Sequence, residues 1–192
     1  MRKRQYLVDT AFRLFYEHGI HAVGINQVLQ EAGVAKQTLY NHFECKDNLV
    51  VAVVERRDQV FFQWLENRLQ QVPTGRDALL EIFSAIDDWI NDRVEGLHRF
   101  HGCFFINTCG EYGDTSHPIH KQCAAHKLRV ETLIHQHVQA LGTGETESDR
   151  LTHGLFMLKE GAIIKAHVKG DRSAALQARQ VADSWLPQSE SA

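Results

Sequence analysis

The sequence predicts an all-α protein of about nine helices, and three observations support this fold class. Apolar residues recur at the helical spacing of three and four along most of the chain. No segment alternates apolar and polar residues as a half-buried strand would. The 192 residues include only 3 prolines, so long helices are permitted almost everywhere.

Three short helices are predicted at the start of the chain, over about 3–18, 25–32 and 35–43. The first has one apolar stripe, which includes Leu7, Leu14 and Phe15, with polar residues between. Gly19 and Gly33 follow the first two helices, and glycine is common where a helix ends.

Longer helices are predicted after residue 45, over about 46–71, 78–94, a short stretch within 95–115, 116–141, 148–168 and 173–185. The first of these keeps one face apolar for many turns until the segment from Pro73 to Gly75 breaks it. Three short helices are too few to build a large core. The sequence therefore predicts a small domain, 1–46, and a larger helical domain, 47–192, with the long helix from Lys46 shared by both.

The two short helices on either side of Gly33 have the layout of a helix-turn-helix, whose second helix enters the major groove of DNA. Leu39 and Phe43, four residues apart, supply an apolar anchoring face. The remaining side chains suit DNA, because amides read base edges while hydroxyls and cations contact phosphates. The predicted DNA contacts are Lys36, Gln37, Thr38, Tyr40, Asn41, His42, Lys46 and Arg4.

The net charge of −3 and the pI of about 6.4 at first argue against a nucleic-acid-binding protein. The charges are unevenly placed, however. Residues 1–46 hold six Lys or Arg against four Asp or Glu, which is a net charge of +2, and residues 47–192 have a net charge of −5. The mild acidity belongs to the larger domain, so it does not count against DNA binding by the first.

A specific motif covers this region: GVAKQTLYNHF from Gly33 to Phe43, then CKDNL from Cys45 to Leu49. Its turn, aromatic anchor and lysine resemble the tetracycline-repressor (TetR) family, and the resemblance covers roughly the first 55 residues. One departure is Gly24, which stands where members usually have a serine or threonine cap. The resemblance implies a DNA-binding domain followed by a helical ligand-binding and dimerisation domain.

The resemblance also implies a homodimer in which the last two long helices form a four-helix interface, so that two recognition helices read a palindromic operator in double-stranded DNA. The helix over 148–168 is apolar on more than one side, which requires cover on both. The alternative is that both helices simply close the core of one chain. The predicted interface residues are Leu151, Gly154, Leu155, Leu158, Gly161, Ala162, Ala178, Val181 and Trp185.

The family places a ligand cavity among its middle helices, and this part of the chain is rich in aromatic residues. An apolar pocket with few polar groups suits a small organic inducer. Plain core packing is the simpler interpretation for most of these aromatics. The predicted ligand contacts are Phe61, Trp64, Phe83, Trp89, Cys103, Phe104, Asn107, Tyr112 and His135.

The four cysteines form no CxxC pair, and in a reducing cytoplasm they are expected to be free thiols. Cys103 lies near His98, Arg99 and His101 in the sequence, which suggests a thiolate that senses oxidants or electrophiles. A buried and inert cysteine is the simpler alternative. One further set, His117, His120, Cys123 and His126, recurs every three residues. Residues spaced three apart are displaced progressively around a helix, so these four side chains cannot converge on one ion. No metal or other cofactor is therefore predicted.

The sequence thus favours a DNA-binding transcriptional regulator, preferably a repressor released by a small-molecule inducer or by a reactive electrophile or oxidant. The chain contains no GxSxG, P-loop, HExxH or Rossmann glycine pattern, so an enzyme is not predicted. A helical protein-interaction module without DNA binding is the other alternative. No signal peptide and no run of about 20 apolar residues is present, which predicts a cytoplasmic protein without a membrane partner.

Overall fold

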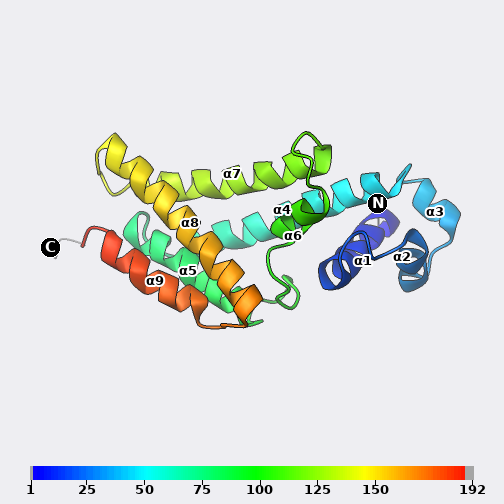
Figure 1. The fold of residues 1–192 in the computed structure, drawn as a ribbon, viewed down its shortest axis with the longest axis horizontal. Coiled ribbons are helices and arrows are strands. Elements are labelled where there is room, and N and C mark those ends of the chain that lie inside the picture. Colours follow the sequence, from blue (N-terminus) through cyan, green and yellow to red (C-terminus); the bar gives the residue numbers. More distant parts are fainter. Residues whose placement is uncertain (1, 189–192) are drawn as a thin grey trace. The chain divides into compact units, whose positions relative to one another are not determined.

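The computed structural model describes residues 2–188, and within them it contains nine helices and no strand. The predicted all-α fold class is therefore confirmed (Figure 1). The helices are α1 (Arg2–His18), α2 (Ile25–Ala32), α3 (Lys36–Tyr40), α4 (Lys46–Leu69), α5 (Arg76–Ile90), α6 (Phe104–Glu111), α7 (Pro118–Gln139), α8 (Glu145–Lys169) and α9 (Ala174–Trp185).

Two helices, α3 and α5, end three or four residues earlier than the sequence predicts, for local backbone reasons. After Tyr40 the chain closes in a turn, in which the N–H of His42 donates to the carbonyl of Leu39, so α3 does not reach residue 43. After α5, Asp92 adopts a φ of 59°, in the left-handed region that interrupts a right-handed helix. The side-chain amide of Asn91 caps this end.

The chain divides into two compact units, and the boundaries fall inside α4, between α5 and α6, and inside α7. The first unit comprises the chain up to Val60 together with Cys103–His126, and the second comprises Phe61–Gly102 together with the chain from Lys127 onward. The compact division thus differs from the sequence-based boundary after residue 46, because the first half of α4 and all of α6 pack with α1–α3. The functional division at residue 46 remains a prediction.

Aromatic packing from distant parts of the sequence builds the core of the first unit. The ring of Phe104, at the start of α6, meets the ring of Phe12 edge-on at 5.2 Å. Arg57 of α4 is only 3% exposed, and its guanidinium lies 5.2 Å from the Phe12 ring and 5.5 Å from the Tyr16 ring. These contacts explain why α6 belongs to the same unit as α1.

In the second unit, α9 packs against both α5 and α8. Trp89 of α5 is 2% exposed, and its ring centroid lies 5.0 Å from those of Phe61 and Phe100. Gly154 of α8 faces Trp185 of α9, because a Cβ built on Gly154 would lie 3.2 Å from Cζ3 of that tryptophan. A larger residue at position 154 would therefore press against the indole.

Among the described residues, no helix combines the length and the apolar character needed to cross a membrane.

Candidate DNA-binding site

The turn between α2 and α3 has the geometry that the sequence predicts. Gly33 adopts φ 61° and ψ 33°, and its N–H donates to the carbonyl of Gln30, while that of Val34 donates to Leu29. These bonds satisfy the last carbonyls of α2 and turn the chain at a position that glycine fills without strain. Gly24 precedes α2 as its cap without a side-chain bond, as expected.

We call α1–α3 the reading head. Helix α3 is anchored on one side, since Leu39 is 0% and Phe43 is 3% exposed. The predicted DNA contacts on and just after α3 lie on the other side: Lys36, Gln37, Tyr40, Asn41 and His42 are exposed and Thr38 is half-buried. The arrangement offers amides, a hydroxyl, a phenol and a cation from one short helix, which is the chemistry required to read a major groove.

Local contacts order this polar surface. The Gln37 amide Nε2 donates to Asn41 Oδ1 at 2.9 Å, and the Lys36 ammonium lies 5.7 Å from the Tyr40 ring centroid. From α1, the guanidinium of Arg4 lies 5.1 Å from the ring of Phe43. This cation–π contact places a basic residue of α1 beside the end of the recognition helix.

Lys46 has a contact that the sequence did not predict. Its Nζ donates to the carbonyl oxygen of Ile20 at 2.5 Å and lies 5.8 Å from the Phe15 ring. Burial lowers the pKa of Lys46, and the carboxylates of Glu111 and Asp47 oppose that shift. The ammonium thus ties α4 to the turn after α1, and its predicted contact with a DNA phosphate remains a prediction.

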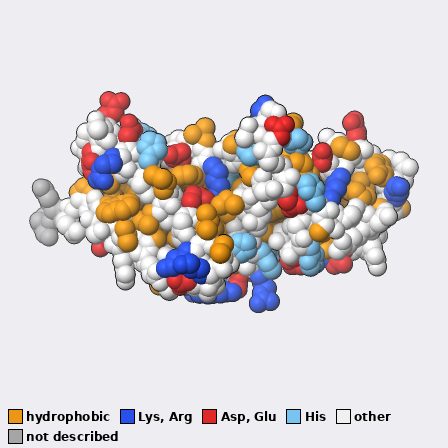
Figure 2. Space-filling model, in the orientation of Figure 1, with side chains coloured by type: hydrophobic (Ala, Val, Ile, Leu, Met, Phe, Trp, Pro, Cys, Tyr) orange, Lys and Arg blue, Asp and Glu red, His pale blue; other side chains and the backbone are white. Residues whose placement is uncertain are grey.

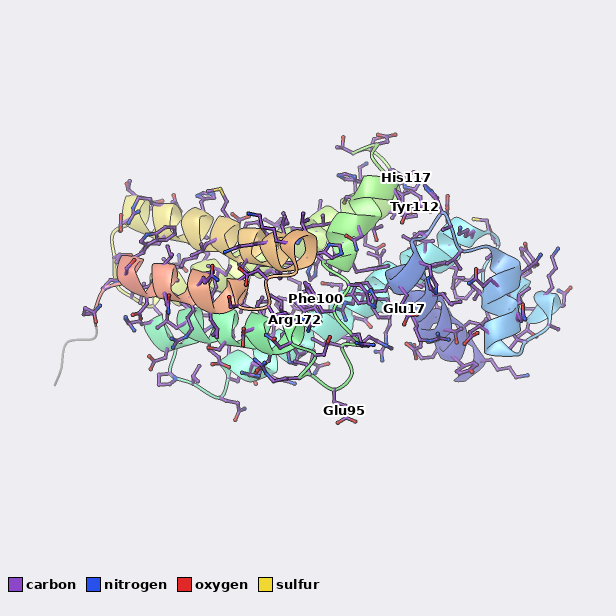
Figure 3. The ribbon with its side chains drawn as sticks, turned by 60° about the horizontal axis from the view of Figure 1, so that its bottom comes forward. Glu17, Glu95, Phe100, Tyr112, His117 and Arg172 are labelled. Carbon is purple, nitrogen blue, oxygen red and sulfur yellow. The ribbon has the colours of Figure 1, made fainter. Side chains whose placement is uncertain are left out.

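The end of α6 lies against the same turn. The two carboxylate oxygens of Glu111 accept the backbone N–H groups of Ile20 and His21. The neighbouring Tyr112 donates its hydroxyl to Asp47 Oδ1 at 3.0 Å, and its ring lies 5.0 Å from that of His117 (Figure 3). Sequence reasoning missed Glu111, since no local pattern links it to a turn 90 residues earlier.

The predicted ligand contacts fall into both compact units. Cys103, Phe104, Asn107 and Tyr112 belong to the first unit, and Phe61, Trp64, Phe83, Trp89 and His135 belong to the second. The first unit's Cys103 and Phe104 are 6% and 2% exposed, while Asn107 and Tyr112 are half-buried. Their roles in binding a ligand remain predictions.

In the second unit an aromatic cluster extends the predicted set. Phe61 contacts Trp64 at a centroid distance of 5.2 Å, and Phe100, which the sequence analysis did not select, joins Trp89 to His167. Phe83 is 1% exposed, and His135 Nδ1 lies 3.1 Å from Thr152 Oγ1. Only the spatial packing of a loop against α8 brings Phe100 and His167 together.

The histidines of α7 have separate partners. His120 Nδ1 lies 2.7 Å from the Tyr112 carbonyl oxygen, whereas His126 Nδ1 lies 2.6 Å from Asp58 Oδ1 and its ring stacks on Phe105. Within residues 2–188, no group of three His, Cys, Asp or Glu side chains is placed to hold a metal ion.

Helices α8 and α9 expose an apolar face, which Figure 2 shows as hydrophobic side chains gathered over these helices. The large exposed apolar side chains of the two helices are Met157, Ile164, Val168, Leu176, Val181 and Trp185. A groove of about 320 Å³ runs along this face, and its lining includes the predicted interface residues Leu158, Gly161, Ala162, Ala178 and Val181. Met157, Ile164 and Val168 are not among the predicted interface residues, although their spacings of seven and four place them on one side of a helix.

Not every predicted interface residue lies on this face. Leu151 and Leu155 are each 1% exposed, so they pack within the chain, and Gly154 accommodates the chain's own Trp185. Nothing lies within 4 Å of a Cβ built on Gly161, which leaves that position open to an approaching helix. The prediction of a partner helix therefore applies best to the part of α8 that follows Leu155.

Two family models together match most of the chain. A model described as "Bacterial regulatory proteins, tetR family" matches residues 7–53, and one described as "Tetracyclin repressor-like, C-terminal domain" matches residues 75–182. The second match alone covers more than half of the chain. The two matches correspond to the helix-turn-helix segment and to the helices from α5 to α9.

The individual relatives include both a transcriptional activator and a transcriptional repressor. The transcriptional activator FasR of Mycolicibacterium smegmatis is 30% identical over 94 residues, or 49% of this chain and 43% of FasR. The transcriptional repressor ComR of Escherichia coli is 27% identical over 138 residues, or 69% of this chain and 64% of ComR. The chain thus matches less than two thirds of either relative.

A solved structure matches over almost the whole chain. The crystal structure of SCO4454, a TetR-family transcriptional regulator from Streptomyces coelicolor, superimposes with a TM-score of 0.86 at 29% identity. The match covers 96% of this chain and 88% of SCO4454.

Proposed function

Because the chain belongs to the tetracycline-repressor family of transcriptional regulators, we propose that it is a repressor that binds a palindromic operator as a homodimer and leaves it when a small molecule binds. The family consists of regulators rather than enzymes. The observation that carries the proposal is α3, with two buried anchors and an exposed polar face. A helix presented in this way fits a major groove.

We propose repression rather than activation as the direction of regulation, and the relatives include both an activator and a repressor.

The formal charge of the first 46 residues is only +2. Binding should therefore depend on two specific reading heads rather than on a broad basic surface. The proposal places its action in the cytoplasm.

A homodimer gains support from the exposed face of α8 and α9. Met157 and Val168 are 66% and 76% exposed, and the groove between the helices is lined largely by small and apolar side chains. Contiguous exposed apolar surface of this kind favours burial against a partner. A second copy would bring its own α8 and α9 to the same surface and so form a closed, two-fold interface.

We propose that a small organic inducer binds in the aromatic interior of the larger domain. It can release the protein from DNA only through its different affinity for the bound and the released geometry of the dimer. The aromatic cluster of Phe61, Trp64 and Trp89 offers apolar contact area, and His135 offers a polar group.

Selection of bound duplexes from random DNA tests this function. We expect the recovered duplexes to share two inverted half-sites whose centres lie about one DNA turn, or a multiple of it, apart. Binding should weaken as the salt concentration rises. Failure to enrich any duplex sequence would contradict the proposal and would favour a helical interaction module instead.

An electrophile is the second candidate signal, and the surroundings of Cys103 favour it. The thiol interacts electrostatically with the guanidinium of Arg57, so a cation lies near the sulfur. However, Cys103 is 6% exposed, whereas Cys45 is exposed. Burial limits the access of a reagent to the sulfur.

We expect Cys103 to react with iodoacetamide at neutral pH more slowly than Cys45 of the same chain, because Cys103 is buried and Cys45 is exposed. Mass spectrometry of the labelled peptides gives both rates. A rate at Cys103 above that of free cysteine would favour the electrophile over the organic inducer. The variant Cys103→Ser would then have to abolish release from DNA by the reagent.

A further inference from the structure

Helix α6 ends in a carboxylate that holds the turn after α1. Glu111 Oε1 accepts the N–H of Ile20 at 2.7 Å, and Oε2 accepts the N–H of His21 at 2.5 Å. Both donors lie just beyond the end of α1, where Gly19 turns the chain with a φ of 89°. Hydrogen bonds to an ionised acceptor are stronger than neutral ones, and a two-oxygen contact also fixes direction.

Further contacts hold the same turn and the start of α4. Lys46 Nζ donates to the carbonyl oxygen of Ile20, so Ile20 is held through both its N–H and its C=O groups. Tyr112, the residue after Glu111, donates its hydroxyl to Asp47 at the start of α4. Two consecutive residues at the end of α6 therefore contact a turn inside the reading head and the start of α4, the helix that follows the reading head.

The surroundings shield the Ile20 half of the contact from water, whereas the His21 side chain is 61% exposed. The side chain of Glu111 is 24% exposed and Ile20 is 1% exposed. The imidazole Nδ1 of His21 also lies 3.5 Å from Glu111 Oε2. At Ile20 a lost acceptor leaves a backbone N–H group that water reaches poorly, so this half of the contact restrains the turn more than a fully exposed bond would.

We propose that Glu111 is a positioning residue for DNA recognition, whose carboxylate fixes the direction of the reading head by clamping the N–H groups of Ile20 and His21. The inference rests on the proposed function in one respect, because the direction of each head matters when a dimer reads two half-sites. Without the clamp, each head samples several directions. The apparent affinity then falls in proportion to the fraction of dimers with the required spacing.

The first test is amide hydrogen exchange of the full chain by NMR. In Glu111→Ala we expect the amides of Ile20 and His21 to exchange about tenfold faster, while amides inside α1 keep their rates. Glu55→Ala is the matched control, because Glu55 is an exposed carboxylate of α4 in the same unit. Rates at both amides within about twofold of this control would overturn the inference.

Glu111→Gln is the conservative variant and serves if the alanine variant does not fold. Its side chain keeps one carbonyl oxygen as an acceptor but turns an NH₂ donor toward the second N–H group. We expect one of the two amides to remain protected and the other to exchange faster. Equal protection of both amides in this variant would contradict the two-oxygen clamp.

The second test uses the selected operator duplex and two versions with the half-sites moved one base pair closer or farther apart. We expect Glu111→Ala to bind the original duplex about tenfold more weakly and to discriminate less between the three spacings. A residue with a merely structural role would lower the affinity for all three equally, and that result would overturn the inference. If the unaltered chain binds no duplex, the proposed function fails, whereas amide exchange still decides whether the clamp exists.

Discussion

Replacing Gln37 and Tyr40 together with alanine is expected to weaken operator binding about 100-fold. Both side chains lie on the exposed face of α3, with Tyr40 41% exposed, and neither belongs to its buried anchor. A specific base contact contributes about 1–3 kcal/mol, and the loss of one base contact and one phosphate contact together is worth about 3 kcal/mol. Alanine favours a helix, so α3 itself should persist.

Fluorescence anisotropy with the selected duplex at fixed salt measures this loss, and circular dichroism checks that the helix content is unchanged. Gln63→Ala is the control, since Gln63 is an exposed glutamine of α4 in the second unit. The single variant Gln37→Ala should in addition relax the base preference at one position of each half-site. An affinity of the double variant within about threefold of the control would refute the placement of the recognition surface on α3.

Replacing Val181 with glutamate is expected to convert the proposed dimer into monomers and to weaken operator binding by about two orders of magnitude. Val181 is 40% exposed and lines the groove between α8 and α9. Charged residues are depleted at interface cores, because burying a carboxylate without a partner costs several kcal/mol. In the monomer the same carboxylate faces water, so the chain should fold normally.

Sedimentation velocity measures the mass, and binding to the selected duplex measures the consequence. Gln180→Glu is the matched control, because it adds the same charge to the adjacent exposed position of α9, outside the residues that line the groove. A dimer that survives Val181→Glu would contradict an interface over this groove. If the unaltered chain sediments as a monomer, the homodimer itself is refuted.

The local elements could be predicted because their signals lie within a few residues of one another. Helix α2 spans Ile25–Ala32 as predicted, and Gly33 has the positive φ that its place after an apolar-periodic segment requires. The anchors Leu39 and Phe43 are both buried although α3 ends at Tyr40, because the turn that follows keeps the bond from the Phe43 N–H to the Leu39 carbonyl. Helix ends were less accurate, because the turn after Tyr40 depends on hydrogen bonds that no propensity specifies.

The candidate site was only partly predictable. The sequence selected the exposed polar residues of α3 but not the contact between Glu111 and Ile20, whose partners are 91 residues apart. The sequence predicts a DNA contact for Lys46 but not its hydrogen bond to Ile20. It also does not separate the two sides of α8, where Leu155 is buried and Met157 is exposed. An amphipathic pattern indicates that one side of a helix is buried, but it does not identify the segment that buries it.

The sequence by itself therefore determined the all-α class, the helix-turn-helix and the family of this protein, because helical spacing and turn chemistry are local properties of the chain. Only the tertiary structure decided that α6 packs with the reading head, which face of α8 and α9 stays open, and which carboxylate holds the turn after α1. These features depend on which distant surfaces meet. That choice comes from the packing of all the helices together, and no short stretch of sequence encodes it.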